Sequence, residues 1–295
     1  MFFRKITHPM DLEIIPRNTN FNFKNSMEEN RYVCGGDPIL THFINALQSM
    51  FPEGERMFIE SAIDCIEKYS GKKTPDSKLM DDFHKFSRQE ATHGFVHMQW
   101  TAELVKLGYE KMSEFTSGMK EFRVKVRKRM DPLRRLSITA AAEHYTASIA
   151  HVVISGKSEI ISTSAVPYNA VLLYHAMEEV EHKSVCYDLY TFFSGNYLLR
   201  LWGYFILTYR LFSQVYKRMH YLLDKDGLWN REGKKMVRKF FFGRRGLFWN
   251  MLPRLIAYLN PFFRPWNTDE REAIENTFGI LREGAGIQPF HSGGR

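Results

Sequence analysis

The chain has few cysteines: Cys34, Cys65 and Cys186 are the only three in 295 residues. Their number is odd and no two form a Cys-x-x-Cys pair, which argues against both a disulfide framework and a thiolate zinc site. We interpret them as packing residues in a protein that folds in a reducing compartment.

Long apolar runs are also lacking. The longest, Leu198 to Phe212, contains Arg200 and Arg210 and is shorter than the roughly 20 apolar residues that cross a bilayer, so no transmembrane helix is predicted. The first five residues are not followed by an apolar run of signal-peptide length. We therefore expect a cytoplasmic protein, which could also lie peripherally on the inner face of the membrane.

Alternating segments rich in Val, Ile and Thr are absent, and helical periodicity dominates instead. We predict one helix from residue 38 to about 66 with an interruption at Pro52-Glu53-Gly54. Further helices are predicted over about 76–107, over 120–154 with a bend or break near Pro132 and an end at Gly156, and over 167–193. Together they indicate an all-α bundle.

Two Glu-x-x-His motifs stand 89 residues apart within these predicted helices, at Glu90–His93 and Glu179–His182. The i, i+3 spacing places a carboxylate and an imidazole on one helix face, as in dimetal sites. A single such motif is a weak signal. However, His175 extends the second motif to positions i, i+4 and i+7 of one stripe, which strengthens it.

Two more inward carboxylates would complete a dimetal pattern, and Glu55 and Glu143 are available upstream of each motif. Glu143 follows the small apolar run 138–142, where an unpaired buried carboxylate would be costly. The alternative for the motif residues is a surface role, with Glu90 beside Arg88 and Glu179 paired with Lys183.

Side chains that bind a metal are usually held in place by hydrogen bonds to further residues, and we expect some of these residues close to the ligands in sequence. The candidates are His97, His144, Asp64, Glu178, Glu181 and Asp188. Glu60 is interpreted as an ordinary helix residue.

Several segments resemble the bacterial family of predicted metal-dependent hydrolases over roughly residues 5 to 265. They are Phe51-Pro52-Glu53-Gly54-Glu55, Gln89-Glu90-Ala91-Thr92-His93, Ala142-Glu143-His144 and His175-Ala176-Met177-Glu178-Glu179-Val180-Glu181-His182. The resemblance implies metal binding and hydrolysis.

The ligand spacing is also similar to that of the p-aminobenzoate N-oxygenase family. That family has a ferritin-like di-iron site with an extra histidine four residues before the last Glu-x-x-His. The similarity implies a ferritin-like four-helix bundle with additional C-terminal helices. It also implies seven metal ligands: Glu55, Glu90, His93, Glu143, His175, Glu179 and His182.

Ligand types alone leave the metal open, because histidine and carboxylate suit iron, manganese and zinc. We expect two metal ions, with iron favoured. The favoured reaction is that of an oxygenase or oxidase acting on an apolar or lipid-like small molecule and served by an electron donor. The alternative is a hydrolase that uses a metal-bound hydroxide.

Positive charge is concentrated near the C-terminal end. Residues 196–264 hold 14 Lys or Arg against 3 Asp or Glu, and 18 of the 43 aromatic residues lie between Tyr197 and Trp266. This composition favours an anionic membrane surface as partner, with additional packing helices as the alternative and no nucleic acid expected. A homodimer is left open.

These patterns suggest four regions. They are an N-terminal arm (1–37), a four-helix dimetal bundle (38–193), a basic aromatic helical appendage (194–266), and a C-terminal helix and tail (267–295).

Overall fold

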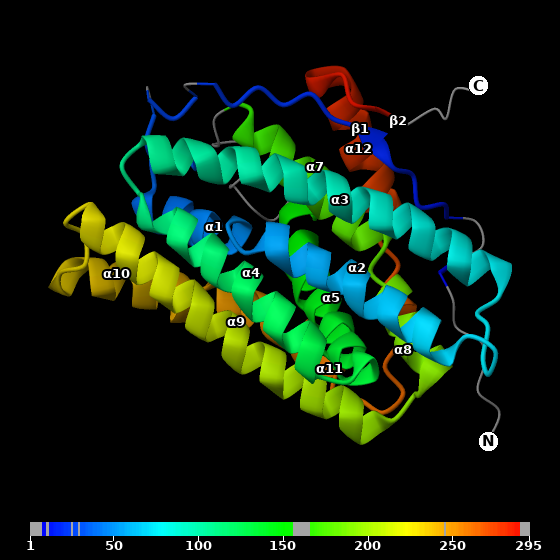
Figure 1. Cartoon of the computed structure of the whole chain (residues 1–295). Coiled ribbons are helices and arrows are strands. Elements are labelled where there is room, and N and C mark those ends of the chain that lie inside the picture. The colour runs from blue at the N-terminus through cyan, green and yellow to red at the C-terminus, as the bar shows by residue number, and fades with distance from the viewer. Residues whose placement is uncertain are drawn as a thin grey trace.

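The computed structural model describes residues 8–9, 12–24, 26–28, 30–155, 166–244 and 246–289, and most of these are helical (Figure 1). The predicted all-α class is confirmed, while the ferritin-like four-helix arrangement stays a prediction. The helices are α1 (Pro38–Gln48), α2 (Phe51–Tyr69), α3 (Ser77–Lys106), α4 (Lys111–Arg129), α5 (Pro132–Ile154), α7 (Tyr168–Glu181), α8 (Val185–Phe193), α9 (Tyr197–Lys225), α10 (Arg231–Phe242), α11 (Leu247–Ala257) and α12 (Arg271–Ala285). The other described elements are a 3-10 turn, η1 (Pro265–Asn267), and two short strands, β1 (Arg17–Asn18) and β2 (Gln288–Pro289).

Acidic side chains fix where several helices begin. Asp37 accepts hydrogen bonds from two backbone N–H groups in the first turn of α1, and Pro38 follows it at the first helical position, as predicted. Asp76 caps α3 and Asp131 caps α5 in the same way. Two of these caps therefore define where α3 and α5, which carry predicted ligands, begin.

Helix breaks differ from the predicted ones. The interruption expected at Pro52-Glu53-Gly54 lies earlier, at residues 49–50, because proline is tolerated in the first turn of a helix and Pro52 helps to start α2. The predicted helix 120–154 is broken near Pro132, as expected, into α4 and α5, but α4 begins nine residues earlier than predicted, at Lys111. The end of this predicted helix at Gly156 lies outside the described residues.

The predicted helix 167–193 is likewise two helices. The first, α7, ends at Glu181, and His182 is its C-terminal cap residue. The second Glu-x-x-His motif therefore spans the end of a helix rather than lying inside one. The backbone N–H of His182 still bonds to the carbonyl of Glu178, so the helical spacing of Glu179 and His182 persists.

Helices α2, α3, α5 and α7 pack around a common interior. α2 lies against both α3 and α5, and α7 lies against α5 and α3. The following helix, α8, contacts α2, α3 and α5 and closes one end of this interior. Side chains that point inward from these elements can therefore meet.

The helices of the basic region also pack on this core. α9 lies along α5 and α1, α11 lies on α5, and α10 lies on α1 and α11. Tyr204 and Leu255 are buried in the same apolar cluster as Phe58 and Leu136. The predicted division of the chain into four regions stays a prediction. Among the described residues, no helix is both long and apolar enough to cross a membrane.

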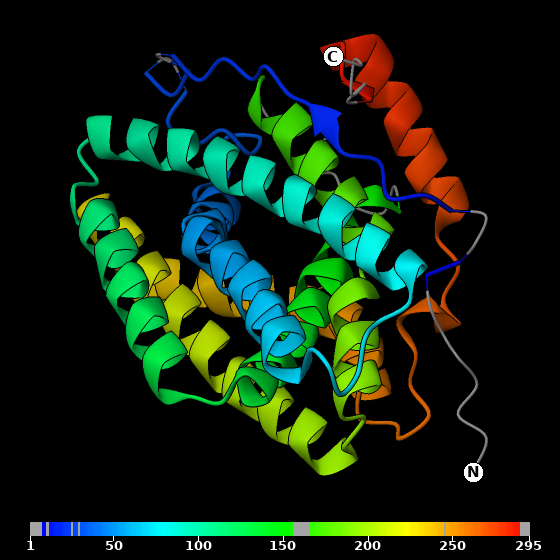
Figure 2. The same cartoon turned by 45° about the vertical axis from the view of Figure 1, so that its right-hand side comes forward.

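The N-terminal arm runs over α7 and reaches the C-terminal part of the chain, next to α12 (Figure 2). There β1 pairs antiparallel with β2, with Arg17 opposite Pro289. This pairing brings the Arg17 side chain to the carboxylates of α7.

Candidate metal centre

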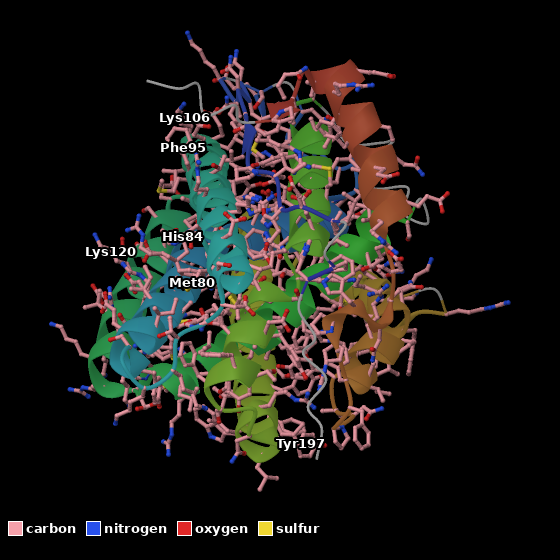
Figure 3. All side chains as sticks on the ribbon, turned by 90° about the vertical axis from the view of Figure 1, so that its right-hand side faces the viewer. Met80, His84, Phe95, Lys106, Lys120 and Tyr197 are labelled. Carbon is pink, nitrogen blue, oxygen red and sulfur yellow. The ribbon has the colours of Figure 1, made fainter. Side chains whose placement is uncertain are left out.

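The seven predicted ligands lie together in the interior, and none is more than 6% exposed. They come from α2 (Glu55), α3 (Glu90 and His93), α5 (Glu143), α7 (His175 and Glu179) and the residue after α7 (His182). Figure 3 shows the outer side of α3, where His84, Phe95 and Lys106 point away from the interior. Because Glu90 and Glu179 themselves are buried, the alternative that they lie on the surface is wrong.

A first group combines Glu55, His93, His175 and Glu179, whose ligand atoms all lie within 4.8 Å of one another. The Nε2 atom of His175 lies 2.6 Å from Oε1 of Glu179 and 3.9 Å from Oε1 of Glu55. The Nδ1 atom of His93 lies 4.0 Å from the same Glu179 oxygen. Two carboxylates and two imidazoles thus face one small volume.

A second group combines Glu90, Glu143 and His182 at the same spacing. The Nε2 atom of His182 lies 3.0 Å from Oε1 of Glu90 and 3.5 Å from Oε2 of Glu143. The same nitrogen lies 3.7 Å from Oε2 of Glu179. Glu179 therefore directs one oxygen toward each group, and the two groups adjoin at its carboxylate.

The bonding state of these atoms tests whether the residues fit a metal. Among the described residues, both carboxylate oxygens of Glu55, Glu90 and Glu143 are buried without a hydrogen-bond partner, as are Nδ1 of His93 and Nε2 of His182. Such atoms are costly in a protein interior unless something binds them. Oxygen and imidazole nitrogen are the donors that iron, manganese and zinc accept, so the residues fit a metal.

Each imidazole is held by a hydrogen bond on its far side. The Nε2 atom of His93 donates to Glu178 at 3.0 Å, and Nδ1 of His182 donates to the amide oxygen of Gln89 at 2.8 Å. Nδ1 of His175 lies 2.5 Å from Nε2 of His97. Metal-bound histidines are usually fixed in this way, because the outer bond sets the ring orientation and leaves the other nitrogen for the metal.

Arg17 ties these outer partners together. Its guanidinium lies 2.9 Å from Glu178 and 2.9 Å from Glu181, and Glu181 also accepts a hydrogen bond from the Gln89 amide at 2.5 Å. Although burial opposes the charge, the two carboxylates raise the pKa of Arg17. One cation from the N-terminal arm therefore supports the partners of both His93 and His182.

The carboxylates repel one another when no cation lies between them. Burial, followed by the charge of Glu90, raises the pKa of Glu55 and of Glu143 well above the ordinary value. Both effects disfavour the charged forms. A bound cation would reverse this preference, which is the electrostatic signature of a metal site.

A glycine on α3 leaves room for the carboxylate of Glu55 at the site. A Cβ atom added at Gly94 would lie 3.3 Å from Oε2 of Glu55 and 3.7 Å from the backbone of Pro52. Only a residue without a side chain fits here with ordinary contacts. Gly94, one residue after His93, thus keeps Glu55 within reach of His175.

Of the predicted outer partners, His97, Glu178 and Glu181 contact the ligands or their partners. His144 instead stacks on Tyr258 and bonds to the carbonyl of Arg254, and Asp64 pairs with Arg127 and Arg135. Asp188 is buried outside both groups. Glu60 pairs with Arg123, consistent with its ordinary helix role.

Sequence reasoning missed Gln89 and Arg17. Gln89 directly precedes the first motif, but spacing alone does not show that its amide reaches a histidine 93 residues away. Arg17 lies in the arm, where no periodicity predicts its position.

A family model described as a predicted metal-dependent hydrolase matches residues 15–269. The chain belongs to this family. Neither a curated protein nor a solved structure matches it. The match includes every residue of the two ligand groups and agrees with the family that the sequence motifs resemble. In this hydrolase-family protein, the buried histidine and glutamate groups indicate metal binding.

Replacing Glu143 by Gln should lower metal content and stabilise the metal-free protein. The change removes one ligand, and it also removes a buried carboxyl group that must either take up a proton or carry an unfavourable charge when no metal is bound, which should add about 1–3 kcal/mol to the stability of the metal-free form. Metal analysis and thermal unfolding with and without a chelator measure both effects.

Glu60→Gln is the matched control, since it alters a carboxylate of α2 that pairs with Arg123 outside the groups. It should keep the metal. A Glu143→Gln protein with unchanged metal content, or with a less stable metal-free form, would contradict the assignment.

Gln89→Ala should weaken metal affinity about 10–100-fold, because His182 loses the bond that orients its ring. Competition with a chromophoric chelator gives the affinity. Gln99→Ala, on the same helix but outside both groups, should leave it unchanged. Equal affinities for the two variants would show that Gln89 does not position His182.

Proposed function

We propose that this protein is a dinuclear metal enzyme whose reaction is hydrolysis. The observation that carries the proposal is the carboxylate of Glu179, which directs one oxygen to each of two buried ligand groups. Glu55, His93 and His175 would hold one ion, and Glu90, Glu143 and His182 the other. The family match supports a metal-dependent hydrolase.

Charge balance supports two divalent ions. Four carboxylates and three neutral imidazoles carry a charge of about −4, which two divalent cations neutralise in an interior that tolerates little net charge. Iron, manganese and zinc all accept these donors, and their relative affinities alone do not select one of them.

When bound, paired metal ions supply a hydroxide at neutral pH and stabilise negative charge on the reacting oxygen. The residues of the chain do the remaining work. Gln89, His97 and Glu178 hold the imidazole rings in one orientation. The near-complete burial of the ligands keeps bulk water out and strengthens electrostatic interactions inside the site.

A second candidate reaction is oxidation by a di-iron centre. It is favoured by the division of ligands among helices, with one Glu from each of α2 and α5 and a Glu-x-x-His from each of the other two segments, as in di-iron carboxylate bundles. This reaction would need an electron donor and would suit an apolar substrate.

Metal exchange separates the two reactions. Hydrolysis predicts that zinc- or manganese-loaded protein cleaves ester or phosphoester test substrates without oxygen, and that the Glu143→Gln variant does not. Oxidation predicts that protein loaded anaerobically with ferrous iron consumes dioxygen and changes its visible absorbance. Oxygen consumption by wild-type protein, together with no hydrolysis, would overturn the first candidate in favour of the second.

We also propose that the protein binds anionic membrane surfaces through the region 194–266. Five large exposed side chains follow one face of α9: Leu198, Phe205, Tyr209, Phe212 and Tyr216. The neighbouring α10 carries four exposed cations, Lys234, Lys235, Arg238 and Lys239. Apolar rings with nearby cations are the composition of interfacial helices.

Changing the four α10 cations to Gln should remove most sedimentation with anionic vesicles, because each cation near such a surface contributes about 1 kcal/mol. Binding should weaken with salt. A control with four exposed cations from elsewhere, Lys24, Lys72, Lys106 and Arg282, should sediment as the wild type does. Equal sedimentation with neutral vesicles would contradict the proposal.

A further inference from the structure

A cavity of about 520 Å³ lies between α4 and α9, on the opposite side of α2 and α5 from α7 (Figure 1). α4 packs on α2 and α3, whereas α9 packs on α5 and α1, so the two outer helices pack against different helices of the core. The space between them is floored by α2 and α5. Its volume is within the range of about 300–1,000 Å³ typical of small-molecule sites.

The cavity wall is mainly apolar. Met57 and Phe58 of α2, Ile138 of α5, and Leu207 and Leu211 of α9 line it. Gly118 on α4 also lines it, and a Cβ atom there would meet nothing within 4 Å. An alkyl or acyl chain would bury apolar surface in this space.

The floor of the cavity adjoins the metal ligands. Phe51 lines the cavity, and its ring centre lies 4.6 Å from that of His175. Gly54 and Ala142 also line it, and they directly precede Glu55 and Glu143. At these two positions the cavity wall is formed by the same turns of α2 and α5 that carry two of the ligands.

Two cations at the cavity have no acidic partner among the described residues. Arg210 of α9 lies over the ring of Phe122 at 4.2 Å, and Lys217 lies over the ring of Phe115 at 5.5 Å. Both rings belong to α4, so the two cations reach across the opening from one helix to the other.

The other charged residues of the wall do not cancel these cations. Arg123 pairs with Glu53, and Arg135 pairs with Asp64. Glu114 of α4, which is exposed, is the one remaining acidic residue of the wall. The α9 side of the opening therefore has a surplus of positive charge.

Gln214 adds a hydrogen-bond donor beside the two cations. Its amide oxygen accepts a hydrogen bond at 2.7 Å from Arg218, which is fully buried. The amide group of Gln214 also has a nitrogen that can donate a hydrogen bond. This arrangement suits a negatively charged group.

We propose that this cavity binds the substrate, an amphiphilic ester whose apolar chain and ester bond lie against the floor formed by α2 and α5, next to the metal ligands, and whose anionic group meets Arg210, Lys217 and Gln214. The assignment of this ligand as substrate rests on the proposed function; its binding does not.

Calorimetric titration of the metal-loaded protein with dodecanoate, below its micelle concentration, tests the proposal. Saturable binding of one molecule per chain is expected. Gly118→Trp fills the space next to Gly118 and should weaken binding at least about tenfold, or about 1.4 kcal/mol. The smaller Gly118→Leu should weaken it less and favours helix formation, so it tests the same space in a chain that folds.

Gly279→Trp is the matched control, because Gly279 lies in α12, away from the cavity, and a Cβ atom added there would also meet nothing within 4 Å. It should bind dodecanoate as the wild type does. The double variant Arg210→Gln, Lys217→Gln should bind dodecanoate more weakly but 1-dodecanol equally well. Loss of both ligands in this variant would overturn the role of the anionic group.

Wild-type affinity in both Gly118 variants, or no saturable binding by the wild type, would overturn the cavity assignment. Metal content is measured in every variant. A wild type that binds dodecanoate but holds no metal would refute the proposed function alone, whereas one that holds metal but binds no dodecanoate would refute the cavity alone.

Discussion

The interior concentrates four carboxylates where water cannot screen them, and the surrounding structure depends on that constraint. Buried like charges destabilise a fold unless a cation or a proton compensates them. The helices around the site meet this demand together: α2, α3, α5 and α7 each direct an acid inward. Gly94 on α3 leaves room for the carboxylate of Glu55 beside it.

The ligands could be predicted from sequence because helical spacing fixes which residues share a face. Glu90 with His93, and His175 with Glu179, follow from i, i+3 and i, i+4 relations alone. Gln89 could not be assigned a role this way, since its bond to His182 depends on how α3 packs against a segment 93 residues away. The role of Arg17 could not be predicted either, because an extended arm shows no periodicity from which the direction of its side chains follows.

Helix boundaries were harder to predict than helix identity. Proline favoured a break at Pro52, yet the first turn of a helix tolerates proline and α2 simply begins there. Likewise, residues 182–184 contain no proline or glycine, yet α7 ends before them and α8 begins after them. Apolar periodicity records which face is buried. It does not record whether the backbone stays helical between two buried faces.

The pairing of β1 with β2 has a consequence in time as well as in space. Arg17 binds Glu178 and Glu181, which support the ring positions of two histidines, and its backbone pairs with Pro289. These contacts join an early segment of the chain to segments that are synthesised much later. Contacts so distant in sequence form slowly, since a long loop must close first. The hydrogen-bond network behind His93 and His182 therefore joins Arg17 to Glu178, 161 residues later in the chain, and is complete only after the arm has met α7.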